Sequence, residues 1–236
     1  MIAAMNRIMP LFLACAAAAA PASAADRRFT VTDFDRVQVE GPFEVVLVTG
    51  KAPSAVATGD SQAALDRVSV DVQGRTLRVR ANASAWGGYP GKSAGSARLT
   101  LSTHDVRAVT VAGSGMLDVN RVRAMRFDAA LSGTGRLGIA SMEADTLMVG
   151  LIGSGTIAMA GKAKALRATV QGAGNFEAPG LVVEDLDLNA ATTGTIAVTA
   201  RRTAKVTSQG VGEVQVLGKP ACTIQQRGPG PVACGD

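Results

Sequence analysis

A pair of glycines separated by one residue recurs through the second half of the chain at a nearly constant interval. The pairs begin at positions 113, 133, 153, 172, 192 and 210, with Thr192 replacing the first glycine of the fifth pair, so the intervals are 20, 20, 19, 20 and 18 residues. Such a period is typical of repeat proteins, in which a unit buries its apolar side only by stacking on its neighbours.

Aliphatic residues share one parity with each glycine pair. In the third copy this series is Leu147, Val149, Leu151, Gly153, Gly155, Ile157 and Met159. Because alternate residues of a strand face the same side, the glycines should face inward, at a turn or where opposing backbones come close. The pattern predicts an all-β protein, a parallel β-solenoid with coils of roughly 20 residues. A β-propeller or a sandwich is the alternative, but propeller blades need about 40 residues.

The N-terminal half, to about residue 105, is less regular than the repeats of residues 106–218. Residues 37–47 keep the parity, with Phe43 in place of the second glycine, and residues 68–79 have the pattern of a hairpin that turns at Gln73-Gly74. A Gly/Ser-rich loop at 82–96 holds the only tryptophan and the only tyrosine, Trp86 and Tyr89. These rings could stack on a sugar or peptide ligand, or fold back over the end of a coil.

Residues 1–24 have the order of a secretory signal peptide. Arg7 precedes an apolar run, and Ala22-Ser23-Ala24 fits a cleavage site. A lipoprotein signal that uses Cys15 is the less favoured alternative, since Phe12-Leu13-Ala14 is a poor lipobox. No later apolar stretch is long enough to span a bilayer, so we expect a periplasmic or extracellular protein.

Charge and cysteine content agree with export. Cleavage after residue 24 leaves 23 basic and 19 acidic residues, a net charge of +4 without a basic stripe, which argues against a nucleic-acid partner. Only Cys222 and Cys234 remain, and we expect them to form a disulfide in an oxidising compartment. It would close a tail, residues 219–236, that lies outside the repeats and caps the open end of the solenoid.

Motifs for cofactors and metals are rejected on their context. The G-x-G-x-x-G of residues 133–138 is followed by a strand, whereas dinucleotide binding needs a helix there. His104 is the only histidine, and the acid at Asp118 does not recur in later coils, so neither a zinc nor a calcium site is expected. We therefore predict no cofactor, no metal site and no catalytic residue.

The order of these motifs resembles a known family. FDRVQVEGPFEVVLVTG, the hairpin LDRVSVDVQGRTLRVRA and the serial GSG repeats are similar to the family of exported bacterial proteins described as "putative auto-transporter adhesin, head GIN domain". The resemblance covers about residues 34–218 and implies a β-helix-like domain, here placed at 25–218. We do not expect the chain to act as an autotransporter by itself, since no C-terminal translocator barrel is recognised in these 236 residues.

The function expected from these features is a non-enzymatic binding, adhesion-like or structural role at the cell envelope. Its partner would be an unidentified envelope polymer or protein. The alternative is a carbohydrate-active enzyme, a polysaccharide lyase or hydrolase, because such enzymes use clustered carboxylates on β-solenoids. Glu184, Asp185 and Asp187 form the densest acidic group. A further alternative is self-association through the coil ends.

Overall fold

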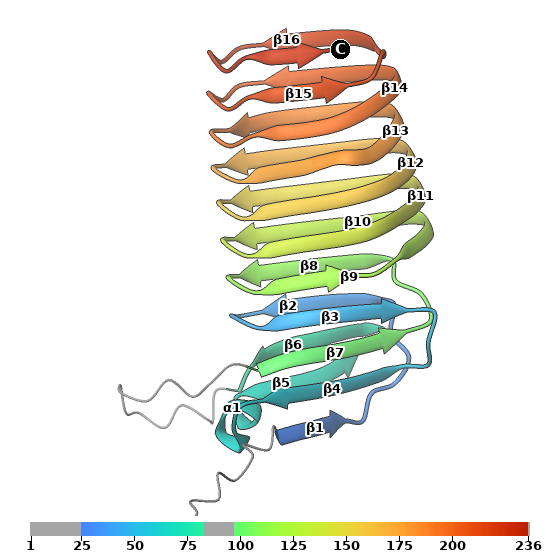
Figure 1. Cartoon of the computed structure of the whole chain (residues 1–236), viewed down its shortest axis with the longest axis vertical. Helices are drawn as coiled ribbons and strands as arrows, with labels where there is room; N and C mark the ends of the chain where they lie inside the picture. The colour runs from blue at the N-terminus through green and yellow to red at the C-terminus, as the bar shows by residue number, and fades with distance from the viewer. Residues whose placement is uncertain (1–24, 83–96, 236) are drawn as a thin grey trace, which may run out of the picture.

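The glycine repeats fold into stacked coils, so the predicted parallel β-solenoid is confirmed (Figure 1). The computed structural model describes residues 25–82 and 97–235. Each regular coil has two long walls. The chain runs along the first wall, reverses at a tight turn that holds the glycine pair, follows the second wall, and returns over a long bend. We call these the glycine turn and the long bend. The first regular coil consists of β8 (Ala108–Gly113) and β9 (Met116–Val119).

The next coils are built from five long strands that continue around the long bend. Parallel pairing joins each strand to the next, and Leu131 lies in register with Leu151, which lies in register with Val170. Equivalent inward residues therefore stack on one another and form one continuous aliphatic core. The strands are β10 (Val122–Gly133), β11 (Arg136–Gly153), β12 (Thr156–Gly172), β13 (Asn175–Thr192) and β14 (Ile196–Ser208).

Each glycine turn rests directly on the backbone of the turn below it. The N–H groups of Thr134 and Gly135 donate to the carbonyl oxygen of Gly113 at 2.9 and 3.0 Å, and the same pattern recurs one coil later on Gly133. A Cβ atom at Gly135 would overlap with the carbonyl oxygen of Gly115. The second glycine of the pair is therefore required by the close approach of two backbones, as the sequence predicted.

The first glycine of a pair is under the same constraint and a second one. A Cβ atom at Gly133 would overlap with the carbonyl oxygen of the first glycine in the turn below. Gly133 and Gly153 have φ of +117°, a left-handed conformation that residues with a side chain rarely adopt. They lie at the apex of the turn and are partly exposed, so they face inward less than expected. Thr192 takes this place in the fifth turn without a positive φ. Its buried hydroxyl donates to the carbonyl oxygen of Gly174 at 3.0 Å and accepts from the N–H of Gly194 at 3.0 Å.

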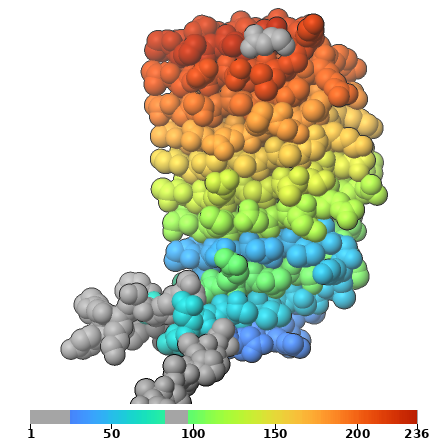
Figure 2. Space-filling view, in the orientation of Figure 1, coloured from blue at the N-terminus to red at the C-terminus, as the bar shows by residue number. Residues whose placement is uncertain are grey.

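The N-terminal coils do not follow the order of the sequence. The coil of β2 and β3 lies between the coil of β6 and β7 and the coil of β8 and β9, as the blue layer in Figures 1 and 2 shows. The predicted hairpin is present as antiparallel β5 and β6. The elements are β1 (Ala25–Phe29), β2 (Arg36–Glu40), β3 (Glu44–Thr49), β4 (Ser54–Gly59), α1 (Gln62–Asp66), β5 (Val68–Gln73), β6 (Thr76–Ala81) and β7 (Ala97–Thr103).

A buried carboxylate holds this permuted order together. Asp35 is only 6% exposed, and its side chain accepts from Nε of Arg75 at 3.0 Å, with Arg107 at 3.8 Å. Its backbone N–H donates to the Arg75 carbonyl, and its carbonyl accepts from the Arg107 N–H at 2.7 Å. Asp35 thus joins its own coil to the coils on both sides.

The C-terminal tail continues the solenoid instead of lying outside the repeats. Strand β15 (Val214–Leu217) completes the second wall, and the tail adds β16 (Ala221–Gln226) on β14 and β17 (Val232–Cys234) on β15, both parallel. Gly228 and Gly230 stack on the turn of Gly210 and Gly212. This seventh pair was not recognised in the sequence, because Pro229 separates the two glycines and the pair lies among other turn residues.

Two glycine-to-alanine variants, one in the turn before β11 and one within β11, test the close approach at the turn. Gly135→Ala should lower the stability by about 2–3 kcal/mol, since a Cβ there meets backbone that cannot move without opening the stack. Gly150→Ala is the matched control: it has ordinary φ, and nothing lies within 4 Å of its Cβ position. The control should leave the melting temperature unchanged or raise it slightly. Equal melting temperatures for the two variants would contradict the stacked-turn interpretation.

Candidate functional site

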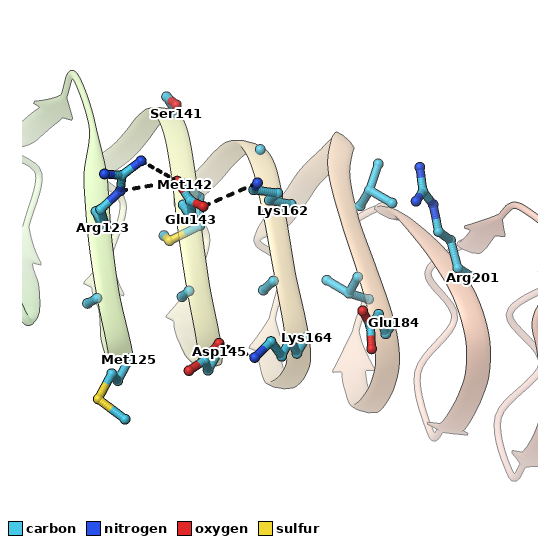
Figure 3. Close-up of a pocket in the computed structure, with 16 residues that line it drawn as sticks. Arg123, Met125, Ser141, Met142, Glu143, Asp145, Lys162, Lys164, Glu184 and Arg201 are labelled. Atoms are coloured by element: carbon cyan, nitrogen blue, oxygen red, sulfur yellow. Dashed lines mark hydrogen bonds and ion pairs between the residues drawn. The ribbon is translucent and has the colours of Figure 1, made fainter.

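A groove runs along the long bend, perpendicular to the strands, with a volume of about 950 Å³. We call it the edge groove. Five coils contribute to it, from β10 to β14, so at about 4.8 Å per coil it is about 19 Å long. Its floor is a column of small aliphatic residues that are largely buried. Charged side chains lie on both sides of this column (Figure 3). The floor residues are Ala124, Ala144, Ala163 and Val183.

The first charged column has alternating signs. Arg123, Glu143 and Lys162 lie in register on three successive strands. Glu143 forms ion pairs with Arg123 at 3.0 Å and with Lys162 at 3.2 Å. The hydrogen bonds from Arg123 and then from Lys162 lower the pKa of Glu143. This column therefore joins three coils by charge.

The second column also alternates. Asp145 pairs with Lys164 at 2.8 Å, and hydrogen bonding to Asp145 raises the pKa of Lys164. Glu184, on the next strand, contributes to this rise through its charge. Adjacent opposite charges satisfy one another here, so most of the groove charge stabilises the stack and is not left over for a ligand.

A β-bulge breaks this pattern at the end of the groove. Val183 lies in register with Ala200 and Asp185 with Thr203, so β14 places two residues, Arg201 and Arg202, opposite Glu184. Arg202 forms an ion pair with Asp185, and its hydrogen bond, followed by one from Thr203, lowers the pKa of that carboxyl. Arg201 is exposed and forms no ion pair with any residue of 25–82 or 97–235. Bulges commonly re-aim a side chain in this way.

The other end of the groove exposes an apolar side chain. Met125 occupies the position before Asp145 in the second column, and it is 81% exposed. The groove therefore presents an unpaired guanidinium at one end, a flexible thioether at the other, and a neutralised charge pattern between them.

A second depression lies on the second wall, with a volume of about 590 Å³. Small residues, Gly138, Ala140, Ala158 and Ala160, make it shallow, and Asp118 and Glu177 border it. The residues between the two glycines of each pair form a column that is exposed at every copy: Ser114, Thr134, Ser154, Ala173, Thr193 and Val211.

The acidic residues of the enzyme alternative are not brought together. Glu184 lines the edge groove, Asp185 is engaged by Arg202 and Thr203, and Asp187 lies in register with Arg167 and Lys205 on the first wall. The lowered pKa of Asp185 is opposite to what a general acid needs. His104 is exposed in the bend after β7. Within the described part of the chain, no three His, Cys, Asp or Glu side chains gather as metal ligands.

The structure tests some of the remaining predictions and leaves others untested. The Cys222–Cys234 disulfide is present. The predicted ligand contacts Trp86 and Tyr89 and the predicted signal peptide at 1–24 lie outside the described residues, so these stay predictions. The edge groove itself was missed, although charges that alternate at the repeat spacing, Arg123, Glu143 and Lys162, were visible in the sequence. The change of parity at the long bend hid them.

Comparison with known proteins identifies the family. The family model described as "Putative auto-transporter adhesin, head GIN domain" matches residues 33–220. This chain belongs to that family. The resemblance inferred from the head GIN motifs is therefore confirmed. No curated protein sequence matches the chain.

Solved structures share the head GIN fold. An adhesin-like protein from Bacteroides fragilis, described as a "putative adhesin", has a TM-score of 0.82 at 19% identity, over 89% of this chain and 96% of its own. A "putative lipid binding protein" from Parabacteroides distasonis has a TM-score of 0.70 at 19% identity, over 92% and 98%. A "putative adhesin" from Parabacteroides merdae has a TM-score of 0.68 at 18% identity, over 92% and 98%. At these identities the likeness concerns the fold alone.

The lowered pKa of Glu143 predicts how acid affects the stack. A carboxyl whose pKa is lowered on folding stabilises the fold above its unfolded pKa, and this contribution is lost as the pH falls through the lowered value. Glu143→Gln should therefore melt below the wild type at pH 6. The difference should begin to narrow as the pH falls below about 4.3, the ordinary pKa of a glutamate, and should vanish below the lowered native pKa. Glu177→Gln, which removes an exposed carboxylate without an ion pair among the described residues, is the control and should show no such pH dependence. A pH-independent difference for Glu143→Gln would contradict the ion-pair column.

Proposed function

We propose that this protein is an exported, non-enzymatic binding module of the cell envelope with an adhesion-like role. Membership of the head GIN family and a disulfide both support export and an external partner. No helix among the described residues has the length and apolar character to cross a membrane. The signal peptide predicted at residues 1–24 and its removal are part of this proposal.

The edge groove is the proposed binding surface. The observation that carries this assignment is the bulge of β14, which leaves Arg201 without an ion pair beside a groove whose other charges are largely paired. A guanidinium in this position can bind a carboxylate or a phosphate in bidentate geometry. We therefore assign the partner to extended envelope polymers that carry anionic groups, with Met125 supplying an apolar contact about four coils away.

A rigid stack suits this task. Because each coil contacts only its neighbours through backbone pairing and a continuous core, the groove is preformed and loses little conformational entropy when a partner binds. A polymer with a repeat close to a multiple of the coil spacing could contact several coils at once. The extent of the groove over five coils, about 19 Å, supports binding of an extended chain in preference to a small molecule.

A binding assay with two charge-reversal variants tests the proposal. Purified acidic and neutral envelope polysaccharides are immobilised, and binding of the wild type is compared with Arg201→Glu and with Arg136→Glu, an exposed arginine on the second wall. Arg201→Glu should weaken binding to the acidic polysaccharides about tenfold, a loss of about 1.4 kcal/mol. Arg136→Glu should bind as the wild type does.

Other outcomes would redirect the assignment. Equal binding by the wild type and Arg201→Glu would exclude the edge groove as the binding surface. Turnover of the polysaccharide that is lost on substitution of Glu184, Asp185 or Asp187 would favour the enzyme alternative. Binding only to anionic lipid vesicles would favour lipid binding, as in the description of the Parabacteroides distasonis protein, and would favour the depression on the second wall as the site.

A further inference from the structure

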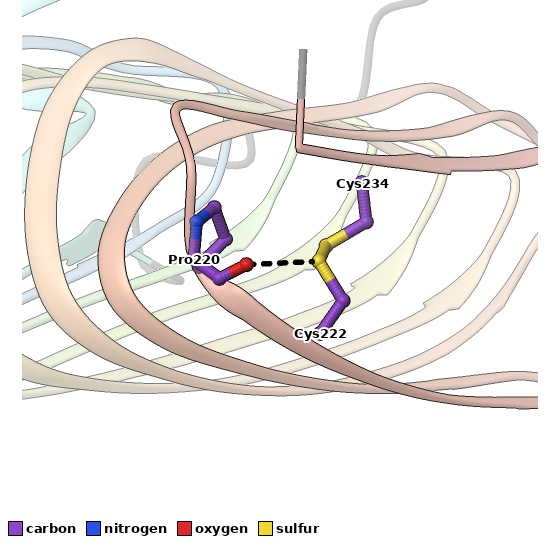
Figure 4. The surroundings of a disulfide bond; sticks show 3 residues. All are labelled: Pro220, Cys222 and Cys234. Atoms are coloured by element: carbon purple, nitrogen blue, oxygen red, sulfur yellow. Dashed lines mark hydrogen bonds between the residues drawn. A yellow bond between two sulfur atoms is a disulfide. The ribbon is translucent and has the colours of Figure 1, made fainter.

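The C-terminal end of the solenoid exposes unpaired strand edges on both walls. Among the described residues, β16 pairs only with β14 and β17 only with β15. The outermost coil, at the upper end of the stack in Figure 1, therefore has one free side in each wall. The sequence predicted that the tail caps this end. It does not cap it, because the disulfide lies inside the last coil (Figure 4).

The residues with free backbone groups follow from the hydrogen bonds below them. The Arg227 N–H donates to the Ser208 carbonyl at 2.7 Å, and the Gly235 N–H donates to the Val216 carbonyl at 3.1 Å. In a parallel ladder, alternate residues bond to opposite neighbours. The N–H and C=O groups that face away from the stack are therefore those of Cys222, Ile224 and Gln226 in β16, and of Val232 and Cys234 in β17.

The side chains of these same residues form the open end of the core. Ile224 continues the inward column of Val206 but is 42% exposed, because no coil covers it. The Cys222–Cys234 disulfide joins the two walls beside it. The Gln226 side-chain amide donates to the carbonyls of Gly228 and Gly230 at 3.2 and 2.9 Å, so its polar group is satisfied locally. The C-terminal end of the core thus exposes the apolar Ile224, and the disulfide and the hydrogen bonds of Gln226 hold the residues beside it in place.

This edge lacks the usual protection against pairing. Exposed strand edges in proteins are commonly blunted by charged residues. Neither ACTIQQ of β16 nor VAC of β17 contains a charge. The N-terminal end differs: β1 carries Asp26, Arg27 and Arg28, and Arg27 pairs with Asp66 of α1 at 2.5 Å. Of the edge strands that the structure describes at the two ends, those at the C-terminal end are uncharged and β1 at the other end is charged.

We propose that a second copy of this chain binds at the C-terminal end, strand to strand, about a twofold axis through Ile224 and Val232. In β16, Ile224 then faces Ile224 of the other copy, and Cys222 faces Gln226. These are antiparallel pairs whose free N–H and C=O groups point at each other, so each pair exchanges two backbone hydrogen bonds. The two apolar core ends meet and bury Ile224.

The symmetry of the end favours a second copy over an unrelated strand. The free groups of β16 are arranged evenly on both sides of Ile224. The disulfide places Cys222 opposite Cys234, so two residues along each strand Ile224 lies opposite Val232. One axis therefore satisfies both walls at once. Because a contact about a twofold axis closes on itself, and because the edge strand β1 at the other end carries charged residues, the assembly stops at a dimer and does not grow into a filament.

Cysteine cross-linking tests the register of this dimer. The axis places Thr223 opposite Gln225 of the other copy, in a non-hydrogen-bonded pair with Cα atoms about 4.5 Å apart, which a disulfide can bridge. Both side chains face outward, away from the native disulfide. The mature chain with Thr223→Cys and Gln225→Cys should form a covalent dimer on mild oxidation. The single variant Thr223→Cys is the matched control and should stay uncross-linked.

Sedimentation of the uncross-linked protein completes the test. The wild type should sediment as a dimer, Ile224→Lys as a monomer because it places two ammonium groups on the axis, and Thr223→Lys as a dimer. Circular dichroism should show that all three are folded. A wild type that stays monomeric at every concentration, assemblies that grow beyond a dimer, or cross-linking by Thr223→Cys alone would each overturn the proposal. Because the end lies outside the edge groove, these results do not depend on polysaccharide binding.

Discussion

Backbone-to-backbone stacking at the glycine turn is the constraint on which the rest of the structure depends. The carbonyls of turn glycines such as Gly113, Gly133 and Gly153 accept hydrogen bonds from the turn above, and the approach leaves no space for a Cβ at the glycines stacked on them. This contact fixes where each coil starts relative to the one before it. Once the register is set, the inward aliphatic residues must stack in columns, and the core becomes continuous without any single large side chain holding it.

The same register determines the surface. A residue type that recurs at the repeat interval becomes a column, and opposite charges in successive copies become an ion-pair ladder, as Arg123, Glu143 and Lys162 show. Within such a ladder, the opposite charges neutralise one another. The surfaces that we propose for recognition lie where the repeat is broken: the bulge that leaves Arg201 without an ion pair, and the last coil, where the column of Val206 ends at the exposed Ile224. Both proposed interaction surfaces are interruptions of an otherwise repetitive stack.

The sequence was sufficient to predict the solenoid, because period and parity are local properties that survive in one chain. The inward position of Gly135 and the hairpin of β5 and β6 follow from the same patterns. The order of the N-terminal coils could not be predicted, since it depends on long-range contacts such as those of Asp35 with Arg75 and Arg107. The edge groove could not be predicted either, because the alternation of inward and outward residues shifts at the long bend. The sequence also does not tell which of Arg201 and Arg202 forms an ion pair, since this depends on a bulge in β14.

Native-state hydrogen exchange at the glycine turns measures the stacking contact most directly. Turns at the surface of a protein usually exchange quickly, since their N–H groups bond to water. The N–H groups of Gly135 and Gly155 instead donate to carbonyls of the coil below at 3.0 Å. They should exchange as slowly as the N–H groups of the neighbouring wall strands. Exchange of these two groups at the rate of an unstructured loop would contradict the claim that the turns fix the stack.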